Sequence, residues 1–164
     1  MTDTTRMLRD DTAVRVRSMQ PGDAEALVRF HDSLAPETTR MRFFTVHPHL
    51  TVKETARFTT VDHVDREAFV AEVDGQIIGI GRFERSRDRD EGEVAFVVAD
   101  AWQGRGVAPM LLAFLVHHAR ALGLRRLVAQ TLTDNHPMLK VFTRSGLPMT
   151  RILVGGVVDV TLTL

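Results

Sequence analysis

The loop Gln103-Gly104-Arg105-Gly106-Val107-Ala108 follows a predicted strand of residues 93–98 and opens a predicted apolar helix of residues 107–122. Glycines allow the backbone to approach a ligand closely, and the first turn of a helix offers unpaired N–H groups and partial positive charge. A loop of this kind binds an anion such as a phosphate. The alternative interpretation is a glycine-containing helix cap followed by an ordinary core helix.

Three phosphate-binding patterns compete for this loop. A Walker loop requires Gly-Lys-Ser/Thr at its end, where this sequence has Val107-Ala108-Pro109. The dinucleotide fingerprint requires a glycine or alanine in place of Pro109. The remaining pattern, Gln/Arg-x-x-Gly-x-Gly/Ala, is met by Gln103, Gly106 and Ala108. Pro109 is compatible with it, because the first helical turn does not need the missing N–H.

Hydrophobic periodicity on either side of the loop predicts short strands and helices. The Asp74-Gly75 pair is typical of a two-residue hairpin turn. The order of these elements predicts an α+β fold with a central mixed, partly parallel sheet of about seven strands and helices on both faces. The predicted strands cover residues 14–18, 68–73, 76–83, 93–98, 127–132, 152–154 and 157–162, and the predicted helices cover residues 21–34, 36–44, 52–58, 107–122 and 135–145.

The length of 164 residues suits a single domain, which we expect to span residues 12–164. Residues 1–11 are polar and show no periodicity, so we expect a flexible N-terminal segment there. Residues 84–92 are dense in charge and predict a solvated loop. Because no apolar leader or membrane-length span is found, we expect a cytoplasmic location and no membrane partner.

Composition excludes several kinds of chemistry. The 21 basic and 21 acidic side chains cancel, so no general field attracts nucleic acid. Cysteine is absent, which excludes disulfides, cysteine-ligated zinc and a thiol nucleophile. Tyrosine is absent as well, which excludes a tyrosine general acid. His47-Pro48-His49 has no third ligand nearby in sequence, so we expect no metal site.

A second motif follows the loop at a definite distance. Asn135 lies 32 residues after Gln103 and begins a helix that contains Phe142 and ends at Gly146. The two motifs together resemble the Gcn5-related N-acetyltransferase (GNAT) family, which uses such a loop around the pyrophosphate of acyl-CoA. The resemblance implies the GNAT fold and acetyl-CoA as the acyl-donor substrate. The expected cofactor-binding residues are Phe96, Val97 and Val98 through their backbone, Gln103, Gly104, Arg105, Gly106, Val107, Ala108, Asn135, Phe142 and Arg144.

A narrower likeness covers residues 12–164. The stretches of residues 36–44, 93–98 and 135–138 are similar to the bacterial Pat-type protein lysine acetyltransferases. This likeness implies acetyl transfer to a protein lysine, with an AMP-forming acyl-CoA synthetase as the expected protein partner. Regulatory domains that such proteins often carry are not visible, so we expect a short member or a single domain of one. The alternatives are a small-amine or antibiotic acetyltransferase and a non-catalytic acyl-CoA-sensing module.

Glu93 is the candidate catalytic base. A lysine amine has a pKa near 10.4, so presenting it as a free base at pH 7 costs about 4.6 kcal/mol. Glu93 begins the strand that leads into the loop, and it matches the glutamate that serves as base in Pat-type enzymes. The alternative is an ordinary exposed strand glutamate. Many relatives have a tyrosine four residues before the second motif's glycine, where this chain has Phe142.

The segment of residues 36–44 lies between the first predicted strand and the hairpin, where the resemblance places the acceptor side of the fold. Arg40 and Arg42 could pair there with acids that flank a target lysine. A small-amine enzyme would sooner need an acidic pocket for its cationic substrate. The alternative is a helix whose arginines are only solvated.

Overall fold

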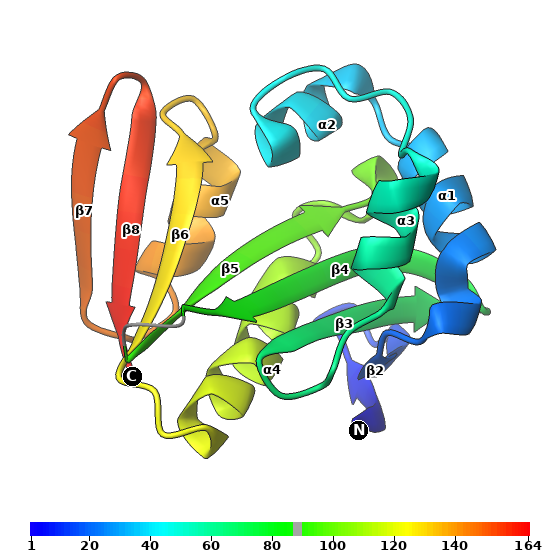
Figure 1. Ribbon diagram of the computed structural model, residues 1–164, viewed down its shortest axis with the longest axis horizontal. Helices are drawn as coiled ribbons and strands as arrows, with labels where there is room; N and C mark the ends of the chain where they lie inside the picture. Colours follow the sequence, from blue (N-terminus) through cyan, green and yellow to red (C-terminus); the bar gives the residue numbers. More distant parts are fainter. Residues whose placement is uncertain (87–89) are drawn as a thin grey trace.

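One open sheet of eight strands dominates the computed structural model, which describes residues 1–86 and 90–164 (Figure 1). The strands are β1 (Asp3–Met7), β2 (Ala13–Ser18), β3 (Arg66–Val73), β4 (Gln76–Arg85), β5 (Glu91–Val98), β6 (Arg126–Leu132), β7 (Met149–Val154) and β8 (Val157–Thr163). Their order across the sheet is β1-β2-β3-β4-β5-β6-β8-β7, and β5 and β6 form its parallel pair. The mixed, partly parallel sheet is confirmed, with one strand more than the sequence predicted.

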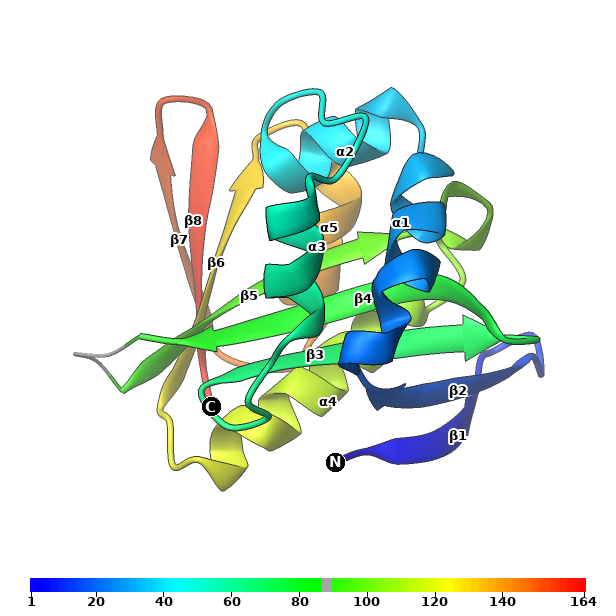
Figure 2. The ribbon, with the colours of Figure 1, turned by 45° about the vertical axis from the view of Figure 1, so that its right-hand side comes forward.

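Helices cover both faces of this sheet, as predicted. The helices are α1 (Ala24–Asp32), α2 (Pro36–Phe43), α3 (Val52–Thr59), α4 (Val107–Ala121) and α5 (His136–Thr143), with single 3-10 turns η1 (Pro21–Asp23) and η2 (Asp100–Trp102). Figure 2 shows α1 and α3 on one side of the sheet and α4 on the other, with α2 beyond the ends of β5 and β6. Among the described residues, no helix has both the length and the apolar composition that crossing a bilayer requires.

The N-terminal segment differs from the prediction, because it contains a strand of the sheet. Residues 1–11 were expected to be flexible, but β1 pairs antiparallel with β2 along its whole length. The polar sequence of β1 gives no hydrophobic periodicity, because this edge strand is held by backbone hydrogen bonds and by an ion pair of 2.6 Å between Asp3 and Arg15. Leu8, directly after β1, is buried in the core.

The connection between β4 and β5 is shorter than the sequence predicted. Glu84 and Arg85 end β4, and Glu91 and Gly92 begin β5, although the sequence predicted a solvated loop over residues 84–92. Glu91 is buried and lies 3.4 Å from the guanidinium of Arg126. Charged side chains thus end two paired strands here, which a charge pattern alone does not reveal. Residues 87–89 of the predicted loop lie outside the described residues.

The predicted hairpin at Asp74-Gly75 is confirmed. Both residues have positive φ, 50° and 74°, and they connect β3 to β4 in two residues. That conformation matches the twist of the flanking strands and favours Asp-Gly. The hairpin places β4 beside β3, and the other edge of β4 pairs with β5, where the candidate site begins.

The two faces of β5 point into different layers of the molecule. Side chains alternate along a strand, so Val94, Phe96 and Val98 lie in the core that α4 and α5 cover. Val97 packs on the opposite face, against the smaller core of α1 and its neighbours. Glu93 is exposed on the same face as Val97. The strand therefore presents Glu93 toward the layer that contains α2.

The pairing of β5 with β6 ends early. The parallel pairing runs only from Glu91 to Glu93 on β5 and from Arg126 to Val128 on β6. Beyond that point β5 stays paired with β4, and β6 stays paired with β8, so the two strands diverge (Figure 1). The sheet is split at Glu93 into two halves.

Gly92 makes this junction possible, and we expect Gly92→Ala to destabilise the fold by about 1–3 kcal/mol. A Cβ at this position would lie 2.1 Å from Cε2 of the buried Phe83 ring, so the ring or the strand must move. Urea unfolding measures the change. The control is Gly22→Ala, where a Cβ meets nothing within 4 Å. Equal stability of the two variants would contradict the expected clash.

Candidate active site

A cavity of about 250 Å³ lies where β5 and β6 separate. Three structural units that are distant in sequence enclose it: α2, the diverging strands, and the start of α5. The lining residues are Met41, Arg42, Phe43 and Phe44 from α2 and its end, Glu93, Val94, Ala95 and Phe96 from β5, Ala129, Gln130 and Thr131 from β6, and Asn135, Met138 and Phe142 from α5.

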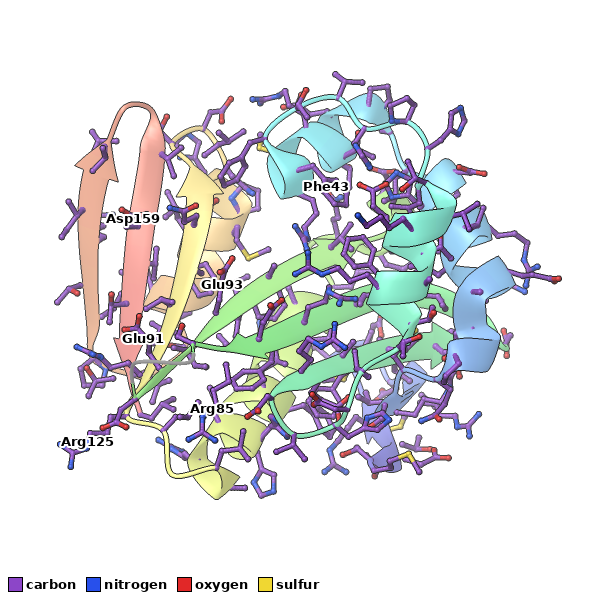
Figure 3. All side chains as sticks on the ribbon, in the orientation of Figure 1. Phe43, Arg85, Glu91, Glu93, Arg125 and Asp159 are labelled. Atoms are coloured by element: carbon purple, nitrogen blue, oxygen red, sulfur yellow. The ribbon has the colours of Figure 1, made fainter. Side chains whose placement is uncertain are left out.

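Glu93 lies at the point of separation. It pairs in register with Glu84 on β4 and with Val128 on β6, and it is the last β5 residue that pairs with β6. Figure 3 shows Glu93 between the diverging strands, on the side of the sheet where Phe43 of α2 lies. An exposed carboxylate at the base of a cavity can accept a proton from a group bound there.

Arg42 lines the same cavity as Glu93. Its guanidinium lies over the Phe43 ring, with Cζ 4.8 Å from the ring centroid. Within residues 1–86 and 90–164, Arg42 makes no hydrogen bond or ion pair. Burial lowers the pKa of the Arg42 guanidinium to about 10, and the negative charge of Glu93 acts in the opposite direction. The cavity wall therefore contains a cation whose donors are available to a ligand.

A second buried arginine lies behind the first. Arg82 of β4 donates a hydrogen bond to the carbonyl oxygen of Phe58 (2.9 Å), and its Cζ lies 4.3 Å from the centroid of that ring. Burial lowers the pKa of Arg82 to about 9, and the like charge of Arg42 lowers it further in the same direction. Two guanidinium groups thus make the α2 side of the cavity positive around the carboxylate of Glu93.

Arg40 is engaged within the protein. Its guanidinium lies 2.7 Å from carboxylate oxygens of both Glu37 and Asp134. The second of these ion pairs connects α2 to the turn between β6 and α5. Of the two arginines expected to meet a substrate, Arg42 alone is available without breaking such pairs.

The open edge of β5 offers backbone groups to a ligand. The N–H of Ala99 donates to the carbonyl of Ile78 on β4 (2.9 Å), so alternation directs the N–H groups of Phe96 and Val98 to the open side. The N–H of Val97 faces β4 instead. The side chain of Gln103 donates to the carbonyl of Val98 at 3.1 Å. An extended ligand can therefore pair with this edge as an added strand would.

The glycine-rich loop lies beyond the cavity, at the start of α4. Gly104 and Gly106 have φ of 74° and 97°, and Gly106 is the N-cap of the helix. A Cβ at either glycine would meet nothing within 4 Å, so the space above the loop is open. The first N–H groups of α4 have no intrahelical partner and can receive an anion there.

The second predicted motif forms one wall of the cavity. The side chain of Asn135 accepts a hydrogen bond from the N–H of Met138 (3.2 Å) and caps α5. The Phe142 ring is 1% exposed and lies 6.1 Å from the Phe96 ring, so the wall there has no hydroxyl. Arg144 is exposed at the far end of α5 and does not line the cavity.

The predicted site residues therefore fall into three groups. Glu93, Phe96, Asn135 and Phe142 line the cavity. Val98 offers its N–H at the open edge of β5, whereas the expected role of Val97 is corrected, because its N–H faces β4. Residues 103–108 form the loop at the helix start, and Arg144 stands apart. The sequence analysis missed the β6 wall at residues 129–131, because its alternating strand pattern gives no functional signal.

The histidines near α2 make separate contacts. His47 Nε2 lies 3.1 Å from a carboxylate oxygen of Glu54, and His49 Nδ1 lies 3.1 Å from one of Asp32. In the part of the chain that the structure describes, no three histidine or acidic side chains are grouped as a metal ion requires.

Known acetyltransferases resemble this chain in sequence. Residues 13–148 match the profile of the acetyltransferase (GNAT) domain family. Acetyltransferase Pat of Mycolicibacterium smegmatis is 33% identical over 134 residues, which make up 80% of this chain and 40% of that protein.

Solved structures give the same result. The GNAT domain of S. lividans PAT is 39% identical, with a TM-score of 0.93 over 99% of this chain and 97% of that one. A cAMP-binding acyltransferase from Mycobacterium smegmatis is 28% identical, with a TM-score of 0.67 over 99% of this chain and 47% of that one. The chain thus spans less than half the length of each of the two mycobacterial relatives.

Proposed function

The chain belongs to the GNAT family of acetyltransferases, and from this premise we propose that it transfers an acetyl group from acetyl-CoA to a lysine side chain of a protein. The position of Glu93 and the open edge of β5 at the cavity, with the start of α4 directly after that strand, carries the proposal. The likeness to the GNAT domain of S. lividans PAT over nearly the whole chain supports it.

Acetyl-CoA would be held by backbone groups. The N–H groups of residues 104–108 would take the pyrophosphate, since they lie at the positive end of the 15-residue helix α4. The N–H groups of Phe96 and Val98 would pair with the pantetheine arm and the acetyl oxygen. Gln103 would support this edge through its bond to the Val98 carbonyl, and Asn135 and Phe142 would form the opposite wall.

The transfer begins with a proton. Glu93 would accept it from the lysine ammonium, directly or through one water; presenting a free lysine amine at pH 7 costs about 4.6 kcal/mol, so a base positioned beside the attacking nitrogen lowers the barrier. The free amine then attacks the thioester carbonyl carbon, the C–N bond forms, the nitrogen releases its second proton to solvent, and the C–S bond breaks. A backbone N–H of β5 would stabilise the charge that develops on the oxygen. The departing thiolate takes its proton from water, because Phe142 has no hydroxyl.

The charges of the cavity favour a protein acceptor over a polyamine. A polycation would have to enter a cavity that Arg42 lines, with the buried Arg82 behind it and Glu93 as the carboxylate that lines the cavity. A single lysine on a protein surface brings one amine, and neighbouring acidic or carbonyl groups could bind Arg42. The acceptor we propose is the active-site lysine of an AMP-forming acyl-CoA synthetase, and we expect the reaction in the cytoplasm.

Incubation with acetyl-CoA and a purified acetyl-CoA synthetase tests the proposal. Mass spectrometry should find acetylation on the active-site lysine of the synthetase, and thiol release should be slow with a polyamine panel. Efficient turnover of a small amine without modification of the synthetase would favour the small-amine enzyme. Binding of acetyl-CoA with no transfer to either acceptor would favour the acyl-CoA-sensing module.

Arg42→Glu should lower the rate with the synthetase by about tenfold more than the rate with a polyamine, because the cavity then loses a cation that binds acceptor oxygens. The matched control is Arg29→Glu, the same charge change on the exposed face of α1. Rates measured with both acceptors give the ratio. An equal loss with the two acceptors would mean that Arg42 does not discriminate between them.

A further inference from the structure

The side chain of Arg105, in the loop before α4, contacts Asp10, Thr12 and Trp102. Its Nε and NH2 atoms donate to Oδ2 of Asp10 at 3.0 and 2.7 Å, and NH2 also donates to Thr12 Oγ1 at 3.2 Å. Its Cζ lies 4.0 Å from the ring centroid of Trp102. The position of the guanidinium is fixed by its two hydrogen bonds to one carboxylate and by its contact with the aromatic ring.

Asp10 itself is firmly placed in the turn between β1 and β2. Its other oxygen, Oδ1, accepts the N–H of Thr12 at 3.1 Å, and the N–H of Leu8 donates to the Thr12 carbonyl at 2.9 Å. Leu8 is 6% exposed and anchors the turn in the same core that contains the first residue of α4. The Thr12 hydroxyl and then Arg105 lower the pKa of Asp10 to about 2, so its carboxylate is charged in any ordinary assay.

Among residues 1–86 and 90–164, the side chain that supports the loop between its two glycines is that of Arg105. Arg105 stands between Gly104 and Gly106, both with positive φ and with nothing within 4 Å of a Cβ position. Glycine has the greatest backbone freedom, so these two positions allow the loop many conformations. A loop that binds a ligand through several N–H groups at once must adopt a single conformation. Ordering the loop on binding lowers the affinity, unless the loop already has that conformation in the free protein. The Arg105 contacts supply that order.

We propose that Asp10 is a positioning residue for acetyl-CoA: through Arg105, the turn between β1 and β2 holds the glycine-rich loop in its binding conformation. The inference rests on the proposed function, in which this loop takes the pyrophosphate. It gives a role to a segment outside residues 13–148, which match the family. Asp10 acts on the ligand only through Arg105, with no contact of its own.

Asp10→Asn should raise the Kd of acetyl-CoA about fivefold, the effect of losing one ordered ion pair, and should raise KM with little change in kcat. Calorimetry measures the Kd. Hydrogen exchange of the amides of residues 104–108 in the protein without acetyl-CoA should be faster in the variant. This second measurement does not depend on the proposed function, so a chain that binds no acetyl-CoA still tests the contact.

The matched control is Asp3→Asn, which removes the other ion pair of the same hairpin, with Arg15, far along β1. It should leave both the Kd and the loop exchange unchanged. An equal effect of the two variants would reduce Asp10 to general support of the hairpin. A lower Kd in Asp10→Asn would mean that Asp10 competes with the ligand for Arg105, which overturns the proposal.

Two further variants keep the inference testable if Asp10→Asn folds poorly. Thr12→Val removes only a hydroxyl that accepts from Arg105 and bonds to Asp10, and it should raise loop exchange and Kd in the same direction by a smaller factor. Asp10→Asn and Arg105→Gln combined should weaken binding no more than Arg105→Gln alone, because both remove one contact. If the losses of affinity from the two substitutions add up in the double variant, the proposed action of Asp10 through Arg105 is contradicted.

Discussion

Glu93→Gln is expected to lower kcat by about 10²–10⁴-fold at neutral pH while the Kd of acetyl-CoA stays within about twofold of the wild type. The amide keeps the size of the side chain but cannot accept the ammonium proton. The loss should shrink as the pH rises toward the lysine pKa of about 10.4, since more of the acceptor is then already neutral. Initial rates from pH 6.5 to 9.5 measure this recovery.

Glu84→Gln is the control for this experiment. Glu84 lies directly opposite Glu93 on β4, is exposed, and is paired with Arg57 at 3.1 Å rather than lining the cavity. It should retain the wild-type rate and pH profile. A wild-type rate at neutral pH in Glu93→Gln, or the same loss in both variants, would exclude Glu93 as the base.

Gly106→Glu is expected to raise the Kd of acetyl-CoA by at least on the order of 100-fold. Gly106 is the N-cap of α4, so its side chain would enter the open space in which the first N–H groups of the helix receive an anion. A carboxylate there repels a phosphate and competes for those N–H groups. Calorimetry with acetyl-CoA measures the loss, and thermal unfolding checks that the variant is folded.

Backbone strain must be separated from charge in that variant. Gly106 has a φ of 97°, which any L-residue adopts at a cost of about 1–2 kcal/mol. Gly106→Ala carries the same strain without the carboxylate, so it should unfold at a similar temperature and bind acetyl-CoA much more tightly than Gly106→Glu. Unchanged affinity in a folded Gly106→Glu protein would remove the loop from the proposed acetyl-CoA site.

Signals that act within a few residues were predictable. The Asp74-Gly75 turn needs positive φ at both positions, and the observed values satisfy that need. The start of α4 at Val107 and the cap of α5 at Asn135 also follow from local chemistry, since a glycine and an asparagine precede the helices. The loop and both motif helices were therefore visible in the order of the residues, whereas Glu93 was singled out by the resemblance to Pat-type enzymes.

Features that depend on pairing across the chain were not visible. β1 forms because its polar backbone meets the edge of β2, and Asp10 reaches Arg105 across 95 residues. Arg40 pairs with Glu37 on its own helix and also with Asp134, 94 residues away. Each of these distant partners lies outside the segment that contains the residue, so no local pattern reports the contact.

The residue order along the chain was sufficient for the GNAT motifs, because each motif requires a backbone conformation that its own residues set. The cavity was decided by the tertiary structure. It exists because β5 leaves β6 after Glu93 while each strand stays bonded to its other neighbour, and because α2 brings Arg42 over the opening. Hydrogen bonds between strands distant in sequence determine where that separation begins. For this reason Glu93, an exposed residue of β5, faces a binding cavity.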